Sequence, residues 1–366
     1  MTEKAKNKIV VLSAAFFFLG FFVWCLLKPA DPVSDSERRP LAAMPSFSVS
    51  AVMSGKFMQD FESYATDQFP LRTGFRTLKS AVALYLFRQR DVGGIYIADG
   101  YASKLEYPVN RASLDNAAVR FRRVYDKYLD GQNVNIYLSV IPDKNYFLAG
   151  QNGYPAMDYE AFVSYLRERT EYMQYIDIFD CLEIEDYYKT DTHWRQEKIT
   201  DVAGRLAEGM GISLSGEYRL KLLENPFYGV YYGQSALPLP AEQIYYLESD
   251  ILDVSRVYDF ETNGEIPVYD MEKAWGKDPY EMFLSGSKSL LTIQNPGGAR
   301  DRRLIVFRDS FGSSIAPLLA EGYGEVTLVD IRYLSSELLG NFLEFDNCDV
   351  LFLYSTLVLN NSETLK

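Results

Sequence analysis

His193, the sole histidine among 366 residues, lies in the segment KTDTHWRQEK. Asp191 precedes it by two positions, so in extended backbone the two side chains point to the same side. A carboxylate that accepts the Nδ1–H of an imidazole leaves Nε2 facing a hydroxyl, as in Ser-His-Asp enzymes. The alternative is a structural histidine at a helix start, with Asp191 as its cap. The pair predicts a general base only if the chain also supplies a nucleophile.

A candidate nucleophile, Ser310, lies in LIVFRDSFGSSIAPLL, residues 304–319. An apolar strand runs directly into it and a helix is expected to follow, which places Ser310 at the carboxyl edge of a sheet, where open α/β folds bind their ligands. The free N–H groups at the helix start could stabilise the oxyanion formed when Ser310 attacks an acyl carbonyl. Serine is equally favoured there as a cap. Together with Asp191 and His193, however, Ser310 favours catalysis.

Other chemistries have less support in the sequence. With one histidine, a metal site would have to be rich in carboxylates, and no EF-hand, H-E-x-x-H or paired CxxC pattern occurs. Phosphate-loop and dinucleotide fingerprints are also missing. We therefore predict no metal and no cofactor. The net charge of −13 argues against a nucleic-acid partner, because phosphate binding needs clustered Lys and Arg.

The elements that must position these residues alternate between helix and strand. Apolar runs predict strands at 134–141, 173–180, 304–307, 326–331 and 349–354, and helical spacing predicts helices at 113–128, 159–169, 199–210 and 312–321. This alternation is typical of a parallel α/β sheet. A hairpin is expected around Asp99-Gly100. The tyrosine-rich, glycine-punctuated stretch 218–296 is interpreted as an insertion whose hairpins shape a substrate cleft.

The N-terminus carries a targeting signal. Residues 9–27 form an uncharged, mostly apolar run, about enough to cross a bilayer as a helix. Lys4, Lys6 and Lys8 precede it, so the positive-inside rule leaves residues 1–8 in the cytoplasm. A cleaved signal peptide is the alternative, but KPADPVSD has no convincing cleavage site. We predict an uncleaved signal anchor, single-pass in the cell membrane, with the rest of the chain outside the cytoplasm (periplasm or cell exterior).

Residues 28–90 are expected to connect this anchor to the main domain, 91–366. Residues 28–44 form a polar linker punctuated by proline, and 57–85 indicates two short amphipathic helices broken at DQFPLR. Beyond the anchor only Cys181 and Cys348 are cysteines. They could form one disulfide outside the cytoplasm or remain buried thiols, and the sequence leaves both open.

The sequence resembles the DHHW protein family. The namesake motif of that family matches Asp191-Thr192-His193-Trp194, with threonine in second place. That family is similar to the alginate O-acetyltransferases, which carry an SGNH-hydrolase-like domain. Blocks that also resemble the family occur in matching order over most of the chain, at 37–72, IPDKNYF (141–147), FYGVYYGQS (227–235), RDSF (308–311) and VDIRY (329–333). The resemblance implies a three-layer α/β sandwich with a central, mainly parallel sheet, preceded by one transmembrane helix. It also implies a circularly permuted motif order, since ordinary SGNH enzymes place the serine first.

The resemblance implies that Ser310 is the nucleophile, His193 the base and Asp191 the orienting acid. Arg332 and Tyr333 fall on a family block and could grip sugar or carboxylate oxygens, although Arg332 could equally form a structural salt bridge. Lys144, Tyr188 and Trp194 are further candidates for the same substrate-binding cleft.

The sequence also departs from the SGNH pattern. Arg308 replaces the usual glycine, the acid and base are spaced Asp-x-His, and no Gly-x-Asn-Asp block occurs. An oxyanion hole would therefore rest on backbone amides, notably that of Ser310.

The expected function is O-acetylation of a cell-surface or secreted polysaccharide through an acetyl-serine intermediate. Because acetyl-CoA is not available outside the cytoplasm, the resemblance implies a membrane-embedded partner that supplies the acetyl group. One alternative is a carbohydrate acetylesterase with the same triad and water as the acceptor. A second is a non-catalytic polysaccharide-binding or assembly factor.

Overall fold

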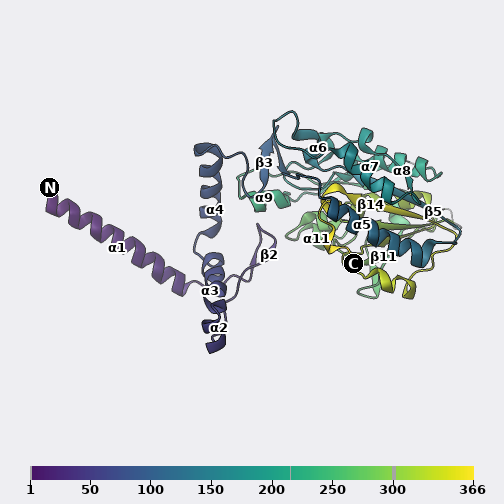
Figure 1. Ribbon diagram of the computed structural model, residues 1–366. Coiled ribbons are helices and arrows are strands. Elements are labelled where there is room, and N and C mark those ends of the chain that lie inside the picture. The colour runs from purple at the N-terminus through teal and green to yellow at the C-terminus, as the bar shows by residue number, and fades with distance from the viewer. Residues whose placement is uncertain (1, 215, 299–301) are drawn as a thin grey trace. The chain divides into compact units, whose positions relative to one another are not determined.

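The computed structural model of the chain describes residues 2–214, 216–298 and 302–366 (Figure 1). The described part divides into two compact units. One holds residues 1–93 together with Tyr232–Pro238, and the other holds Gly94–Tyr231 and Leu239–Lys366. The second unit carries every residue singled out above for chemistry.

A mixed sheet forms the centre of the second unit, and its eight described strands lie in the order β10-β9-β11-β13-β12-β14-β5-β6. The five strands from β13 to β6 run parallel, whereas β11, β9 and β10 are antiparallel. The bounds are β5 (Val134–Ile141), β6 (Gln174–Tyr175), β9 (Arg256–Asp259), β10 (Gly264–Ile266), β11 (Leu290–Gln294), β12 (Arg303–Arg308), β13 (Glu325–Val329) and β14 (Cys348–Ser355). The predicted fold class, a mainly parallel sheet with helices, is confirmed.

Helices cover both faces of this sheet, which gives three layers. Along β14, Leu351 and Leu353 pack into the core with α8 (Thr200–Gly209) and α12 (Gly312–Leu319), while Val350 and Phe352 pack on the other face with α5 (Arg111–Val124) and α7 (Tyr159–Arg169). This alternation follows from the period of two residues along a strand, and both sets are apolar because both faces are covered.

Shorter elements complete the unit. Its remaining helices are α6 (Lys144–Leu148), α9 (Val230–Ser235, which extends into the first unit's segment), α10 (Asp250–Val254), α11 (Met271–Ala274) and α13 (Thr356–Leu359). Among the described residues of this unit, two antiparallel strand pairs lie outside the main sheet, β3 (Ile95–Ala98) with β4 (Tyr101–Lys104), and β7 (Arg219–Leu222) with β8 (Tyr245–Glu248). The first is the hairpin predicted at Asp99-Gly100, and both turn residues have positive φ, as a tight two-residue turn requires.

Two predicted elements differ from the structure. The expected strand at 173–180 is reduced to β6, because the Asp177 carboxylate accepts the Phe179 N–H at 3.0 Å and turns the chain into a short 3₁₀ segment. Residues 218–296, interpreted from the sequence as an insertion, belong in part to the main sheet. They contribute β9, β10 and β11 to the main sheet, where Leu291 and Ile293 are fully buried.

The first unit contains the long apolar helix α1 (Glu3–Leu27). Its 25 residues make it long enough to cross a membrane, and no residue of its apolar window is buried in the structure. The same unit contains the strand pair β1 (Val33–Ser34) and β2 (Arg39–Pro40) and the helices α2 (Val49–Met53), α3 (Lys56–Asp67) and α4 (Arg72–Ala81). The helices α3 and α4 are the two predicted on either side of DQFPLR.

The packing of α5 can be tested at one buried ring. Phe121 is fully buried and lies 4.9 Å from the ring of Phe352 and 5.2 Å from that of Tyr354. We expect Phe121→Ala to lower the free energy of unfolding by about 3–5 kcal/mol, because it removes these contacts and leaves a cavity. Urea denaturation of both proteins measures the difference.

The matched control lies on the same helix. Val119 is 56% exposed, so Val119→Ala should change the free energy of unfolding by less than about 0.5 kcal/mol. Equal losses for the two variants would contradict the placement of α5.

Candidate functional site

The structure brings Ser310, His193 and Asp191 together, although the serine lies 117 residues beyond the histidine in the chain. The Ser310 hydroxyl lies 2.7 Å from His193 Nε2, and His193 Nδ1 lies 2.6 Å from Asp191 Oδ1. Since an ionised carboxylate can only accept, Nδ1 carries the proton and Nε2 is left to accept from the serine. This is the hydrogen-bonded order of a nucleophile, a base and an orienting acid.

The Asp191 carboxylate is held as an anion by several donors. Its side chain is 1% exposed. Oδ1 also accepts the backbone N–H of His193 at 3.1 Å, and Oδ2 accepts that of Val230 at 2.7 Å. These bonds compensate for the burial of the charge and fix the direction from which the imidazole is held.

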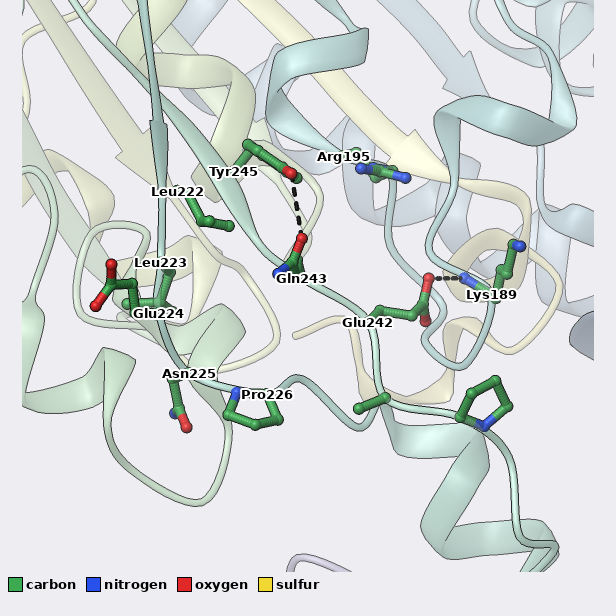
Figure 2. A pocket seen from close by; sticks show the side chains of 12 residues that line it. Lys189, Arg195, Leu222, Leu223, Glu224, Asn225, Pro226, Glu242, Gln243 and Tyr245 are labelled. Atoms are coloured by element: carbon green, nitrogen blue, oxygen red, sulfur yellow. Dashed lines mark hydrogen bonds between the residues drawn. The ribbon is translucent and has the colours of Figure 1, made fainter.

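Glu242 clamps the backbone just before this acid. Its carboxylate accepts the N–H groups of Lys189 and Thr190, both at 2.6 Å, and the Thr190 hydroxyl at 2.7 Å. Figure 2 shows this side chain turned toward the backbone of Lys189. Residues 188–191, which we call the acid-bearing loop, are therefore tied to the segment that leads into β8.

Ser310 occupies a tight turn between β12 and α12. The turn is set by the buried Asp309, whose Oδ1 accepts the Phe311 N–H at 3.0 Å and whose Oδ2 accepts the N–H and hydroxyl of Ser355 at 2.8 and 2.7 Å. Among the residues that the structure describes, no hydrogen-bond acceptor is found for the Ser310 N–H. That amide remains the predicted oxyanion donor.

Gly312 allows α12 to begin directly after this turn. A Cβ at this position would lie 2.7 Å from Arg308 Cβ and 3.0 Å from its Cγ. Only a residue without a side chain lets the helix start so close to the buried stem of Arg308, and Ser310 lies between the two.

Tyr280, which the sequence analysis missed, lies against the base. Its ring is stacked on the His193 ring at 4.0 Å with 7° between the planes, and its hydroxyl lies 2.9 Å from Ser314 Oγ on α12. It comes from a short 3₁₀ segment (Pro279–Met282) in the irregular stretch 218–296, where no periodic signal marks it.

Trp194, Tyr188 and Lys144 are placed differently from their prediction as substrate contacts. All three are buried. The Trp194 indole donates to Ser314 Oγ at 2.9 Å and to the Phe311 carbonyl at 3.2 Å, which anchors the start of α12. The Tyr188 ring packs edge-on against Phe227 and Tyr280. In this structure neither side chain is open to a substrate, and their contacts assign them to positioning.

Lys144 donates hydrogen bonds to the acid-bearing loop. Its ammonium donates to the carbonyls of Tyr188 at 2.8 Å and Lys189 at 3.2 Å and lies 5.0 Å from the centre of the Tyr231 ring. Burial lowers its pKa to about 7, and the negative charge of Asp191 opposes this shift. The structure therefore corrects its role from gripping substrate to holding the backbone that carries Asp191.

Arg332 and Tyr333 lie in the loop after β13. The Arg332 guanidinium donates to both carboxylate oxygens of the buried Asp330, at 2.9 and 2.7 Å, which is the structural salt bridge left open above. Tyr333 is 52% exposed, with the guanidinium 5.5 Å from its ring centre. Of the five predicted substrate contacts, Tyr333 has the largest exposed surface.

A pocket of about 760 Å³ adjoins the acid-bearing loop (Figure 2). Lys189 and Arg195, which flank the Asp191–His193 pair in the sequence, line it together with residues 222–226, 240–243 and 245. The stretch 218–296 thus supplies most of the pocket wall. Cys181 and Cys348 are both free thiols in the structure.

Substitution of Gly312 tests the close approach of α12. We expect Gly312→Ala to lower the free energy of unfolding by about 1–3 kcal/mol, because the added methyl group overlaps the Arg308 stem. Gly204→Ala on α8 is the control, since nothing lies within 4 Å of its Cβ. There, alanine should stabilise the helix by about 0.5–1 kcal/mol. Two losses of similar size in urea denaturation would contradict this account.

Lys144 gives a dependence of stability on pH. Its pKa of about 7 in the folded protein lies below the ordinary 10.5, so between these values the unfolded chain binds more protons. The free energy of unfolding should therefore rise with pH, by at most about 1.4 kcal/mol per pH unit from this group. Lys144→Met should remove that rise between pH 7 and 8.5, measured by urea denaturation.

Lys198→Met is the matched control for this measurement, because Lys198 is exposed and should leave the slope unchanged. A wild-type slope in Lys144→Met would show that Lys144 does not titrate in this range.

Comparison with solved structures supports the fold. A DHHW family protein from Eubacterium siraeum is 21% identical over 75% of this chain and 95% of its own, with a TM-score of 0.61. Bacillus cereus PatB1, solved with a sulfonyl adduct, is 19% identical over 72% of this chain and 95% of its own, with a TM-score of 0.57. The O-acetyltransferase domain of Pseudomonas putida AlgJ is 12% identical over 73% of this chain and 92% of its own, with a TM-score of 0.44.

No protein-family profile and no curated protein sequence matches the chain. At identities of 21% and 19%, the likeness to the DHHW family protein and to PatB1 is one of fold. The DHHW protein and PatB1 confirm, at that level, the relation expected from the Asp191–Trp194 motif and the ordered blocks around it.

Proposed function

We propose that this protein is a serine-dependent O-acetyltransferase that modifies a cell-surface or secreted polysaccharide. The observation that carries the proposal is the hydrogen-bonded chain from Ser310 through His193 to Asp191, with distances of 2.7 and 2.6 Å. It lies at the carboxyl end of β12, the edge at which parallel sheets bind their ligands.

In the first half-reaction Ser310 Oγ attacks the carbonyl carbon of an acetyl donor while His193 Nε2 accepts the hydroxyl proton. The backbone amide of Ser310 would stabilise the negative charge on the carbonyl oxygen. When the tetrahedral intermediate collapses, the bond to the donor breaks and the imidazolium gives its proton to the leaving group. Acetyl-Ser310 remains.

In the second half-reaction a sugar hydroxyl attacks the acetyl-serine. His193, neutral again, accepts the hydroxyl proton, and the second tetrahedral intermediate expels Ser310 Oγ, which takes the proton back. Asp191 stabilises the imidazolium in both steps, and the stacked Tyr280 ring keeps the imidazole plane fixed between them.

Two further features support this proposal. PatB1, which shares the fold, was solved with a sulfonyl adduct, and sulfonyl reagents form such adducts with nucleophilic side chains. The helix α1 agrees with a single-pass anchor whose lysine-rich tail stays in the cytoplasm, so that the second unit would lie outside it.

Placement outside the cytoplasm requires a donor other than acetyl-CoA. We propose a membrane-embedded partner that presents the acetyl group to Ser310. We further propose that Tyr333, held beside Arg332, contacts the sugar acceptor.

Ser310→Ala tests the nucleophile. We expect it to abolish transfer of acetyl groups to a glycan acceptor and hydrolysis of an activated acetyl ester, because no other oxygen occupies the position 2.7 Å from His193 Nε2 among the described residues. It should also abolish labelling by an arylsulfonyl fluoride, detected by mass spectrometry of the peptide that contains residue 310.

Ser313→Ala, at the second position of α12, is the matched control and should keep acetyl transfer, ester hydrolysis and labelling. If acetylation and ester hydrolysis both survive Ser310→Ala, the triad proposal is wrong. If wild-type protein hydrolyses the ester but transfers nothing to a range of glycan acceptors, the protein is an acetylesterase. If it does neither and still binds glycan, it is a binding factor.

A further inference from the structure

The helix α4 exposes an apolar stripe. Phe75, Leu78, Val82 and Tyr85 are spaced by three, four and three residues, which places them on one face of α4 and of the π-helical turn (Val82–Leu86) that continues it, and Leu71 immediately precedes α4. Leu71, Phe75, Leu78 and Tyr85 are 60, 45, 58 and 70% exposed. We call these five residues the α4 stripe. A helix in a water-soluble domain normally turns such a face inward.

The opposite face of α4 is polar and is turned into the first unit. Arg72 forms an ion pair with Glu37, and Arg76 Nη1 lies 2.9 Å from a Glu37 oxygen. The side chains of Arg72 and Arg76 are only 15 and 25% exposed. The helix thus buries its guanidinium groups and exposes leucine and aromatic rings, the reverse of a helix that faces water. A polar face rich in arginine opposite leucine and phenylalanine is typical of helices at membrane interfaces.

Aromatic ring contacts connect the α4 stripe with the helix α1. The Phe21 ring of α1 stacks on Phe69 at 5.8 Å and meets Phe75 of the stripe at 6.3 Å, and Phe69 lies 5.7 Å from Phe75. Phe21 precedes the last residue of α1, Leu27, by six positions, about 9 Å along a helix. If α1 crosses the bilayer, Phe21 therefore lies about 9 Å below the outer end of the apolar run, within the depth of about 5–10 Å to which interfacial helices bury their apolar side chains.

We propose that the α4 stripe lies in the outer interface of the bilayer that α1 crosses, so that the first unit contacts the membrane through two elements. The inference rests on the membrane anchor of the proposed function. Lipid fits the stripe because Leu71, Phe75, Leu78 and Val82 offer no hydrogen-bonding group, and the Tyr85 hydroxyl suits the interface. Protein interfaces of the usual kind combine apolar anchors with hydrogen-bonding side chains.

Site-specific photo-crosslinking in the full chain, in the membranes of the cells that produce it, tests the proposal. We expect Leu78→p-benzoylphenylalanine to give phospholipid adducts on the peptide that contains residue 78 after irradiation, identified by mass spectrometry. Thr73→p-benzoylphenylalanine is the matched control, because Thr73 is exposed but lies on the opposite side of the same helix, and it should give no lipid adduct.

Adducts of the Leu78 probe with another protein, or with a different part of this chain, would overturn the proposal, and so would equal lipid labelling from both positions. Carbonate extraction of the same samples keeps the anchor separate. A chain that resists extraction but gives no lipid adduct at residue 78 retains its anchor and refutes the stripe. A chain that is released has lost the anchor, and the stripe proposal falls with it, whereas the Ser310 assays stand independently of both results.

Discussion

A carboxylate that is almost wholly buried must find donors for its oxygens, and the site is built around this requirement at Asp191. Its donors include the His193 ring, the His193 backbone and the Val230 backbone. Together these bonds fix the orientation of the Asp191 carboxylate, the tautomer of the His193 ring and the path of the chain at the start of α9. Lys144 and Glu242 then hold the residues immediately before Asp191, by donating to carbonyls and by accepting from amides.

Ser310 is positioned by a different part of the fold, the carboxyl end of β12. β12 lies between β13 and β14 in the sheet, so its carboxyl end is held from both sides. Asp309 ties the turn after β12 to Ser355 at the end of β14. Trp194, which follows His193 in the chain, is hydrogen-bonded to Ser314 near the beginning of α12. The distance between Ser310 and His193 is therefore set by buried hydrogen bonds that cross between the two segments, and preorganisation of this kind is what a hydrogen-bonded nucleophile requires.

Much of this arrangement could be predicted from local patterns. The strands β5, β12 and β14 are apolar over nearly their whole length because both faces are buried, and the hairpin at Asp99-Gly100 follows from turn chemistry. Asp191, His193 and Ser310 stood out because the spacing of two and the strand-to-helix turn are local features. The carboxylate of Asp177, which ends β6, was equally visible in the sequence, but its competition with the strand could not be weighed there.

Contacts between distant segments could not be predicted in this way. Tyr280 reaches His193 from a stretch with no periodicity, and nothing in the sequence distinguishes it from the chain's other tyrosines. The burial of Trp194 and Lys144 depends on the packing of β12, α12 and the acid-bearing loop, so residues that resembled substrate contacts proved to be supports. The antiparallel strands β9, β10 and β11 were not predicted, because short strands in a stretch punctuated by glycine resemble a loop.

The position of Tyr280 has a consequence for remodelling the protein. Its ring contacts His193, and its hydroxyl contacts Ser314 on α12, the helix that follows Ser310. A single side chain therefore contacts both the His193 segment and the Ser310 segment. Grafting a different segment into residues 218–296 would alter the pocket wall and the support of His193 together. A chimera that keeps this support of His193 would have to bring a planar side chain with a hydroxyl to the same place. Residues 279–282 are therefore part of the scaffold, and so is Glu242, whereas the other pocket-lining residues, 222–226, 240, 241, 243 and 245, are the more exchangeable portion.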